Sequence, residues 1–291
     1  MPAAVHAETG LRVVTFNLLH GGPWSEWTGE DQQLERRFEM AAAELESLAP
    51  DVVALQEASV GRRRGNVAAR LAARLGMHYV HVRATDRVFG WRVFGWLATR
   101  LIGFAEGPAI LSRYPIAASE VFDLPRCRTW YDPRVMIAAT LATPHGELRV
   151  YSTHTARDDC QLARVAEIVA GRRHGLPSIV MGDLNAGEST AAMGVFGTAG
   201  FVDLYRAANP SETGATVWQP VNSPVASAFR RGDYILALPG HESTVNVGES
   251  RVVLNRPARS ADGATLWPSD HYGVLAAVTL VPNRSARPPS R

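Results

Sequence analysis

The sequence contains no lysine, so all 30 of its basic residues are arginine. It has only two cysteines, Cys127 and Cys160, which fit neither a metal-binding spacing nor a disulfide framework, and we expect free thiols in a reducing compartment. No run of about 18 apolar residues occurs, because Arg92 and Arg100 interrupt the longest candidate, so a membrane-spanning helix is not expected. The formal net charge of +2 gives no sign of the basic face that dedicated DNA-binding proteins carry.

The absence of lysine has two explanations. Arginine grips phosphate with a planar fork of N–H donors, so an all-arginine chain suits a phosphate-bearing ligand. Codon bias in a genome rich in G and C produces the same composition and is the simpler explanation. With 46% apolar residues among 291, the chain can bury one substantial core, and its small net charge argues against disorder of the whole chain.

The two ends of the sequence bear on targeting and on order. The first ten residues contain no basic segment followed by an apolar stretch, so we expect a cytoplasmic protein unless a secretory signal has been removed. Residues 282–291 are polar and rich in proline and arginine, which predicts a disordered tail. No linker rich in proline, glycine or serine divides the remainder, so residues 1–281 are predicted to form a single domain.

Short apolar runs rich in β-branched residues alternate with helical patterns. Helices are predicted at residues 32–48, 66–75 and 161–170. Strands are predicted at residues 11–19, 51–56, 79–83, 108–111, 135–142, 147–153, 178–181, 233–238, 243–247 and 273–280. Many strands are joined by short connections and few by helices, which predicts an α/β fold: a four-layer sandwich of two packed, mixed β-sheets flanked by helices.

Acids, amides and histidines stand where the apolar runs stop. At six such places the sequence supplies Asn17, Glu57, His154, Asp183 with Asn185, Asp233, and Asp270 with His271. Each alone is typical of a solvated loop. Six together favour a common site for a hard divalent cation and a phosphate.

The residue types fit that chemistry. Carboxylates such as Glu57 and Asp270 suit Mg²⁺, which prefers oxygen ligands. The amides of Asn17 and Asn185 can donate hydrogen bonds to phosphate oxygens without adding negative charge. A histidine beside an acid, as at His271, can be held in one tautomer and can transfer protons near neutral pH.

The order of these motifs resembles the endonuclease/exonuclease/phosphatase superfamily of metal-dependent phosphoesterases. The resemblance extends over about residues 11–278, and its most specific parts are the Gly-Asp-Leu-Asn segment at 182–185 and the Ser-Asp-His segment at 269–271. Gln-Glu at 56–57, Asp-Tyr-Ile at 233–235 and the segment at 109–116 support it. The resemblance implies that Glu57 is the principal metal ligand, with Asn17 and Asp270 near the same ion, which would be Mg²⁺ or Mn²⁺, with Ca²⁺ as a further candidate.

The same resemblance implies the catalytic roles. Asp183 and Asn185 look like the pair that orients the attacking water and the scissile phosphate. His271 looks like the essential histidine, with Asp233 as the carboxylate that orients it, and His154 matches a position that contacts the phosphate. The assignment of general base and general acid stays open. For Asp233 the alternative is a simple turn aspartate.

Two departures separate this chain from the abasic-site repair members of the superfamily. Those members carry an aspartate two residues after the strand-one asparagine, where this sequence has Leu19, and they have a tyrosine where it has His154. Both differences favour the deoxyribonuclease-like and sphingomyelinase-like branches over a role in DNA repair.

Residues 86–104 form an aromatic insert that contains a duplicated Arg-Val-Phe-Gly-Trp pentapeptide ending at Trp91 and at Trp96. One interpretation is an extra element packed on the core. Another is an exposed loop that contacts a membrane interface, lines an apolar substrate pocket or supports self-association. Stacking of nucleic-acid bases on the two tryptophans is a third. We predict Trp91, Trp96 and Arg113 as substrate-binding residues.

The sequence thus predicts a divalent-metal-dependent phosphodiesterase for a small-molecule or lipid-like phosphodiester. The alternative enzyme is an endo- or exonuclease of low sequence specificity, with nucleic acid as its partner. A scaffold protein that retained the fold and lost catalysis requires a broken site, and none of the recognised catalytic positions is substituted by a residue unable to take its role. No protein partner is implied.

Overall fold

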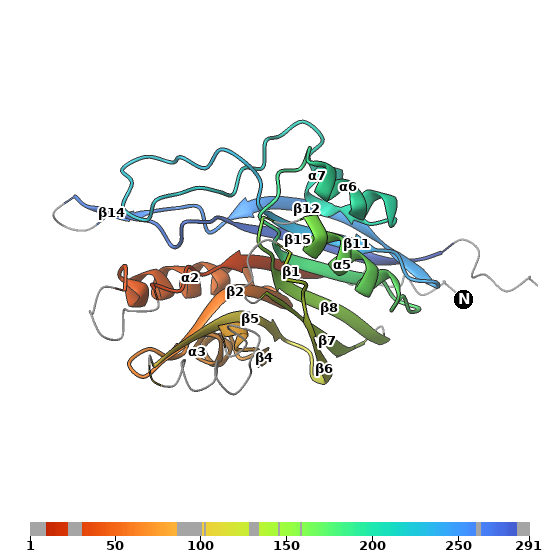
Figure 1. The fold of residues 1–291 in the computed structure, drawn as a ribbon, viewed down its shortest axis with the longest axis horizontal. Coiled ribbons are helices and arrows are strands. Elements are labelled where there is room, and N and C mark those ends of the chain that lie inside the picture. The colour runs from red at the N-terminus through yellow and green to blue at the C-terminus, as the bar shows by residue number, and fades with distance from the viewer. Residues whose placement is uncertain are drawn as a thin grey trace, which may run out of the picture.

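The computed structural model describes residues 10–22, 31–85, 101, 103–127, 134–144, 146–157, 159–259 and 263–283. Two large β-sheets pack face to face, and helices cover their outer faces (Figure 1). The predicted four-layer α/β sandwich is therefore confirmed. No helix in the described ranges is long and apolar enough to cross a membrane.

The first sheet, called sheet A, has the strand order β12-β15-β1-β2-β5-β4, with β3 paired to β2. β1 and β2 run parallel, and the other neighbouring strands of this sheet are antiparallel. The strands are β1 (Gly10–Asn17), β2 (Val52–Gly61), β3 (Gly65–Asn66), β4 (His78–His81), β5 (Phe104–Ser112), β12 (Ser243–Val253) and β15 (Gly273–Pro282).

The second sheet, called sheet B, has the order β10-β11-β9-β8-β7-β6. Here β8 and β9 form the parallel pair. Its strands are β6 (Ile116–Asp123), β7 (Val135–Thr143), β8 (Gly146–His154), β9 (Ser178–Asp183), β10 (Val202–Asp203) and β11 (Asp233–Leu238); β13 (Ala258–Arg259) and β14 (Thr265–Leu266) form a separate hairpin.

Each parallel pair is joined by a crossover helix, because the end of one parallel strand must return to the start of the next. The helix α2 (Leu34–Leu48) connects β1 to β2, and α5 (Asp159–Ala170) connects β8 to β9. With α3 (Val67–Leu75), α2 packs on sheet A, and α5 packs with α6 (Ala191–Thr198) on sheet B. The short helix α7 (Leu204–Ala208) follows β10.

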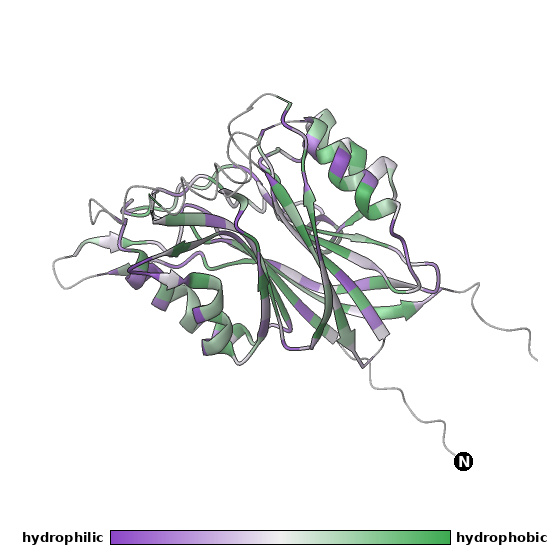
Figure 2. Ribbon diagram, turned by 60° about the horizontal axis from the view of Figure 1, so that its bottom comes forward, coloured by the Kyte–Doolittle hydropathy of each residue, from purple (hydrophilic) through white to green (hydrophobic). Residues whose placement is uncertain are grey.

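Three apolar clusters hold the layers together. One lies between α2, α3 and sheet A, a second lies between the sheets, and a third lies between sheet B and α5 with α6. Figure 2 shows strands that are largely hydrophobic and helices that mix hydrophobic with hydrophilic residues. This pattern is expected where sheets are covered on both faces and helices on one.

The predicted helix at 32–48 begins two residues later than expected. Gln32 and Gln33 adopt left-handed φ angles of 55° and 56°, so the helical turn starts only at Leu34. The apolar residues of this helix, which include Leu34, Phe38 and Leu45, are buried, and the helix ends at Leu48 with Ala49 as its C-cap, before Pro50.

The two cysteines are paired, so the prediction of free thiols is wrong. Cys127 follows β6 and forms a disulfide with Cys160 in α5, and their Cα atoms are 6.5 Å apart. Their sequence separation of 33 gave no sign of the pairing, because it depends on how α5 packs beside sheet B. The paired cysteines also give no reason to expect a reducing compartment.

The predicted tail and insert are only partly described. Pro282 ends β15, and the backbone N–H of Asn283 donates to the carbonyl of Glu242 at 2.7 Å, so the ordered chain extends beyond the predicted boundary. Residues 284–291 lie outside the described residues. Of the insert at 86–104, Phe104 belongs to β5, whereas Trp91 and Trp96 lie outside the described residues.

Candidate active site

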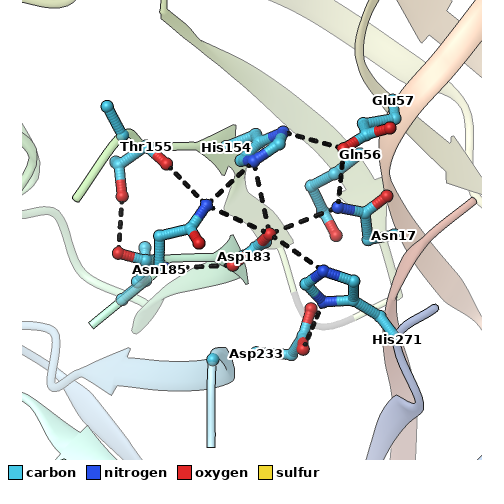
Figure 3. Close-up of polar contacts among 12 residues, drawn as sticks. Asn17, Gln56, Glu57, His154, Thr155, Asp183, Asn185, Asp233 and His271 are labelled. Atoms are coloured by element: carbon cyan, nitrogen blue, oxygen red, sulfur yellow. Dashed lines mark hydrogen bonds and ion pairs between the residues drawn. The ribbon is translucent and has the colours of Figure 1, made fainter. Parts of the chain in front are cut away.

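The polar residues that mark the predicted strand ends gather at one edge of the sandwich (Figure 3). In sheet A, Asn17 ends β1 directly beside Gln56 of β2. In sheet B, Asp183 ends β9 between His154 of β8 and Asp233 of β11. Both parallel pairs deliver their carboxyl ends to this edge, so side chains from the two sheets meet there.

The loop that enters β15 completes the site. Thr15 near the end of β1 pairs with Val274 at the start of β15. Asp270 and His271 precede this pairing and therefore lie beside the end of β1. Both side chains are buried.

A bulge in β2 places Glu57. The pairing between β2 and β5 shifts register between Leu55 and Ala58, and Glu57 has a left-handed φ of 53°, which costs a non-glycine residue free energy. Its carboxylate accepts hydrogen bonds from Asn17 Nδ2 at 3.2 Å and from the backbone N–H of His20 at 3.1 Å. Burial acts to raise the pKa of Glu57, but His20 and Asn17 outweigh it and lower that pKa.

Behind Glu57, the buried side chain of Gln56 connects the two sheets. Its Nε2 donates to Ser152 Oγ in β8 at 3.3 Å, and its Oε1 accepts from Thr15 Oγ1 at 3.3 Å. Ser152 Oγ in turn donates to the carbonyl of Leu55 at 3.1 Å. This bridge fixes the position of Glu57 in sheet A relative to the polar residues of sheet B.

Asp183 lies at the centre of the network. Its Oδ2 accepts from Asn17 Nδ2 at 3.2 Å and lies 3.3 Å from His154 Nε2, and its Oδ1 accepts from the backbone N–H of Asn185 at 2.9 Å. Burial raises the pKa of Asp183 to about 7, although the nearby His271 opposes the rise. A carboxyl group with this pKa can exchange a proton near neutral pH.

His271 is held between two carboxylates. Its Nδ1 shares a 3.0 Å hydrogen bond with Asp233 Oδ2, and its Nε2 lies 3.6 Å from Asp183 Oδ2. Burial favours the neutral ring, but the two carboxylates outweigh it and raise the pKa of His271 to about 10. Thr216 Oγ1 accepts the backbone N–H of Asp233 at 3.2 Å, which fixes the start of β11.

His154 and Asn185 add uncharged polar groups beside Asp183. Asn185 has a left-handed φ of 52°, and its Nδ2 lies 3.0 Å from His154 Nε2 and donates to the carbonyl of Thr155 at 3.0 Å. Burial, followed by the charge of Arg134, holds the pKa of His154 well below its ordinary value. His154 is therefore a neutral imidazole at physiological pH.

Glu57 and Asp270 are the residues best suited to hold a divalent cation. Burial raises the pKa of Asp270 to about 6, and the charge of Glu57 adds to the rise while His271 opposes it. A buried and a partly buried carboxylate that disfavour each other's charge fit a hard cation, which offsets that repulsion. The Nδ2 of Asn17 donates to the carboxylates of Glu57 and Asp183 and so orients them. The Oδ1 of Asn17 accepts the backbone N–H of Leu19 at 3.1 Å.

A second acidic group lies close by. One ligand atom from each of Asp183, Asp233 and His271 falls within 4.8 Å of the others, a grouping that could hold a metal ion. Both ring nitrogens of His271 face carboxylates, however, and its raised pKa keeps the ring protonated, so it has no lone pair to offer. This arrangement suits proton transfer better than metal binding.

The structure thus brings together the predicted catalytic and metal-site residues, which are Asn17, Glu57, His154, Asp183, Asn185, Asp233, Asp270 and His271. A correction concerns Arg113. It follows β5, whose end pairs with the start of β2, so it lies beside Asp51, six residues before Glu57 in the chain. Its guanidinium contacts the carbonyls of Ala49 and Pro50 and does not contribute to this site.

Sequence reasoning missed two residues that support the site. His20 lies 3.5 Å from Glu57 through its Nε2, and its Nδ1 accepts the backbone N–H of Gly22 at 2.8 Å. Its position three residues after Asn17 was the available signal. Arg37 in α2 is 1% exposed, and its spacing of three residues after Leu34 and four before Ala41, which places it on the apolar face of the helix, was the available signal.

Residues 14–271 match the Endonuclease/Exonuclease/phosphatase family. The chain belongs to this family. Its members hydrolyse phosphoesters and typically depend on divalent metals. The matched range contains every residue of the active site described above.

Solved structures of family members share the fold. A family protein from Leptotrichia buccalis C-1013-b is 21% identical, with a TM-score of 0.65 over 91% of this chain and 98% of its own. The mannosyl-6-phosphatase of Bacteroides thetaiotaomicron VPI-5482 is 20% identical, with a TM-score of 0.69 over 93% and 99%. Humanized D. rerio TDP2 is 16% identical, with a TM-score of 0.65 over 93% and 99%. No curated protein matches this chain in sequence.

Proposed function

We propose that this family member is a divalent-metal-dependent phosphodiesterase that hydrolyses a small-molecule or lipid-like phosphodiester. The observation that carries the proposal is the pairing of two sets of residues at one edge. The partly buried carboxylate of Glu57 and the buried carboxylate of Asp270 lie beside a group built from Asp183, His271 and Asp233.

The residues that would hold the cation are Glu57 and Asp270, with Asn17 orienting Glu57 by its hydrogen bond. When bound there, a divalent cation supplies charge neutralisation and polarisation of the phosphoryl group. Which divalent ion binds is part of the proposal, with Mg²⁺ or Mn²⁺ expected because the donors are oxygens.

Asp183 and His271 activate the water molecule that attacks the phosphate. The carboxylate of Asp183, with a pKa raised to about 7, can accept a proton from an attacking water near neutral pH. His271 stands 3.6 Å away and is fixed by Asp233, so its positive ring stabilises the charge on Asp183 and on the phosphate. Asn185 orients Asp183 through its backbone N–H.

The phosphate-binding side of the site favours a diester. His154 and Asn185 are neutral, and both lie beside Asp183. Neutral donors suit the single negative charge of a phosphodiester better than the double charge of a monoester, which calls for additional cationic groups. The net charge of +2 likewise favours a small substrate over a long nucleic acid.

The activities named for two structural relatives guide the choice of substrates to be tested. One relative is a mannosyl-6-phosphatase and another is TDP2, so a sugar phosphate is tested alongside aryl diesters, sphingomyelin and DNA. Hydrolysis is measured with Mg²⁺ or Mn²⁺ and again with EDTA. We expect turnover of 4-nitrophenyl phosphodiesters that stops when the metal is removed.

Matched variants test the assigned residues. His271→Asn and Asp183→Asn should each lower kcat by at least about 10²-fold, because Asp183→Asn removes the proton acceptor and His271→Asn removes the positive charge that stabilises it and the phosphate. His241→Asn, at an exposed histidine, is the control and should match the wild type. Diester turnover that survives EDTA, or a near-wild-type His271→Asn, contradicts the proposal. Cleavage of DNA without any turnover of small diesters replaces it with the nuclease alternative.

A further inference from the structure

A cavity of about 330 Å³ adjoins the metal-site carboxylate Asp270. One wall comes from the segment between β1 and α2 and includes Leu19. The opposite wall comes from the segment after Val217 and includes Trp218, Pro220 and Val221. The volume is at the lower end of the range for small-molecule sites.

Trp218 is presented to this cavity by a fixed backbone. Its side chain is 54% exposed, although both neighbours in sequence are buried. The backbone N–H of Gln219 donates to the carbonyl of Asp270 at 2.8 Å, and Gln219 Oε1 accepts from Tyr272 OH at 2.6 Å. A large aromatic ring held half in solvent by a rigid segment is typical of a ligand contact.

The opposite wall is equally fixed and is strained. Leu19, Gln32 and Gln33 line it, and all three adopt left-handed φ angles between 52° and 56°. The buried guanidinium of Arg37 holds this wall by donating to the carbonyls of Leu19 at 2.9 Å and Gln32 at 2.8 Å. Strained backbone that the surroundings hold in place is concentrated at functional sites.

The charge of the residues that line the cavity disfavours binding of the phosphate group of the substrate there. Asp270 is the one charged residue that lines it among the described residues, and it is acidic. Apolar side chains supply four of its described lining residues. An uncharged organic group fits this lining, and the flat indole of Trp218 selects a flat one.

We propose that this cavity binds an uncharged, flat organic group of the phosphoester, such as an aryl ring, with Trp218 stacked against it. The inference rests on the proposed function, because the phosphate of the same molecule would lie at Asp183 and Glu57. It deepens that function by naming a substrate class: phosphoesters of aromatic or similarly flat alcohols. Trp218 is then the specificity-determining residue.

The test uses two ligands that cannot be hydrolysed, phenylphosphonate and methylphosphonate, in the presence of Mg²⁺. Their affinities are measured by isothermal titration calorimetry on the full chain. We expect phenylphosphonate to bind at least about tenfold more tightly, since an aromatic pair contributes on that order. Trp218→Ala should remove most of the preference, and Trp218→Phe should keep most of it.

Tyr79→Ala is the matched control, because Tyr79 is a half-exposed aromatic residue on β4 and does not line the cavity. Its preference should equal that of the wild type, and circular dichroism confirms that each variant is folded. Equal binding of the two phosphonates, or a preference that survives Trp218→Ala, overturns the inference. A Trp218-dependent preference without turnover of any phosphoester instead refutes the proposed function and leaves the cavity assignment standing.

Discussion

Asp270 is a carboxylate whose surroundings oppose its own charge. Burial raises its pKa to about 6, and Glu57 adds to that rise. A folded-state pKa above the unfolded value of about 3.9 means that the folded protein binds the proton more tightly. The resulting contribution to stability is complete below about pH 4 and is lost as the pH rises through about 6.

This behaviour predicts a pH-dependent effect of the metal on stability. Without metal, the contribution of Asp270 to the free energy of unfolding should fall by about 3 kcal/mol between pH 4 and pH 8. In the proposed metal site Mg²⁺ would bind the ionised carboxylate, so the increase in Tm on adding Mg²⁺ should be larger at pH 8 than at pH 5. Differential scanning fluorimetry with Mg²⁺ and with EDTA measures the difference.

Asp270→Asn is the control for that measurement. The amide does not titrate, so the Mg²⁺-induced rise in Tm should be smaller and should depend less on pH. An equal Mg²⁺ effect at both pH values in the wild type would contradict the assignment of Asp270 to the cation.

Individual site residues were predictable wherever a polar side chain interrupts an apolar run, as Asp183 does. Residues whose role depends on another segment were not. Trp218 carries no local signal, because an exposed tryptophan in sequence looks like a buried one. Arg113 shows the opposite error: it lies within a family motif, but β5 runs antiparallel to β2 and carries it away from Glu57.

Among the elements, α2 does more than cover sheet A. Its residue Arg37 is buried and donates to four backbone carbonyls, from Leu18, Leu19, Gln32 and Pro268. Burial lowers its pKa to about 10, against the nearby carboxylates Asp270, Asp31 and Glu57, so it stays positively charged at neutral pH. One side chain of this helix thereby joins the segment after β1 to the loop that carries Asp270.

Replacing this arginine should cost far more than replacing its neighbour. Arg37→Leu leaves four carbonyls without their donor and should lower the free energy of unfolding by about 3 kcal/mol or more. Arg36→Leu, on the exposed side of the same helix, should change it by less than about 0.5 kcal/mol. Urea unfolding compares the two, and similar losses for both would contradict the role of Arg37.

At the element scale, the sequence predicted most strands and all three longer helices to within a few residues. The missed strand β6 is mostly exposed, so it lacks the apolar alternation that marks a half-buried strand. The missed helix α6 contains Gly194 and Gly197, which weaken a helical pattern. The bulge at Glu57 was not predictable, because the pairing of β2 with β5 creates it.

On the scale of the whole molecule, the disulfide ties two regions that are distant in sequence. Cys127 follows the edge strand of sheet B, and Cys160 stands in the helix that crosses from β8 to β9. The next residue, Gln161, accepts the backbone N–H of Ala156 at 2.8 Å and donates to the carbonyl of Pro125 at 2.9 Å. The disulfide therefore reinforces the contact between the segment after β6 and the start of α5, close to the end of β8 that carries His154.

Reducing this bond should destabilise the protein measurably. Closing a loop of this length restricts the unfolded chain by about 4 kcal/mol, which corresponds to a drop in Tm of roughly 6 °C for a chain of this size. Scanning calorimetry with and without a reductant measures it. The double variant Cys127→Ser, Cys160→Ser should have the Tm of the reduced protein, and that Tm should not change when reductant is added. An unchanged Tm on full reduction would contradict this prediction.

The position of β15 has a consequence for synthesis. It is the last strand in the described chain, yet it lies between β1 and β12 and pairs with both. A nascent chain that has not reached this strand leaves the edge of β1 open and β12 without its partner in sheet A. The two-sheet body and its active site therefore form only after β15 has left the ribosome, and until then the exposed strand edges are candidates for chaperone binding.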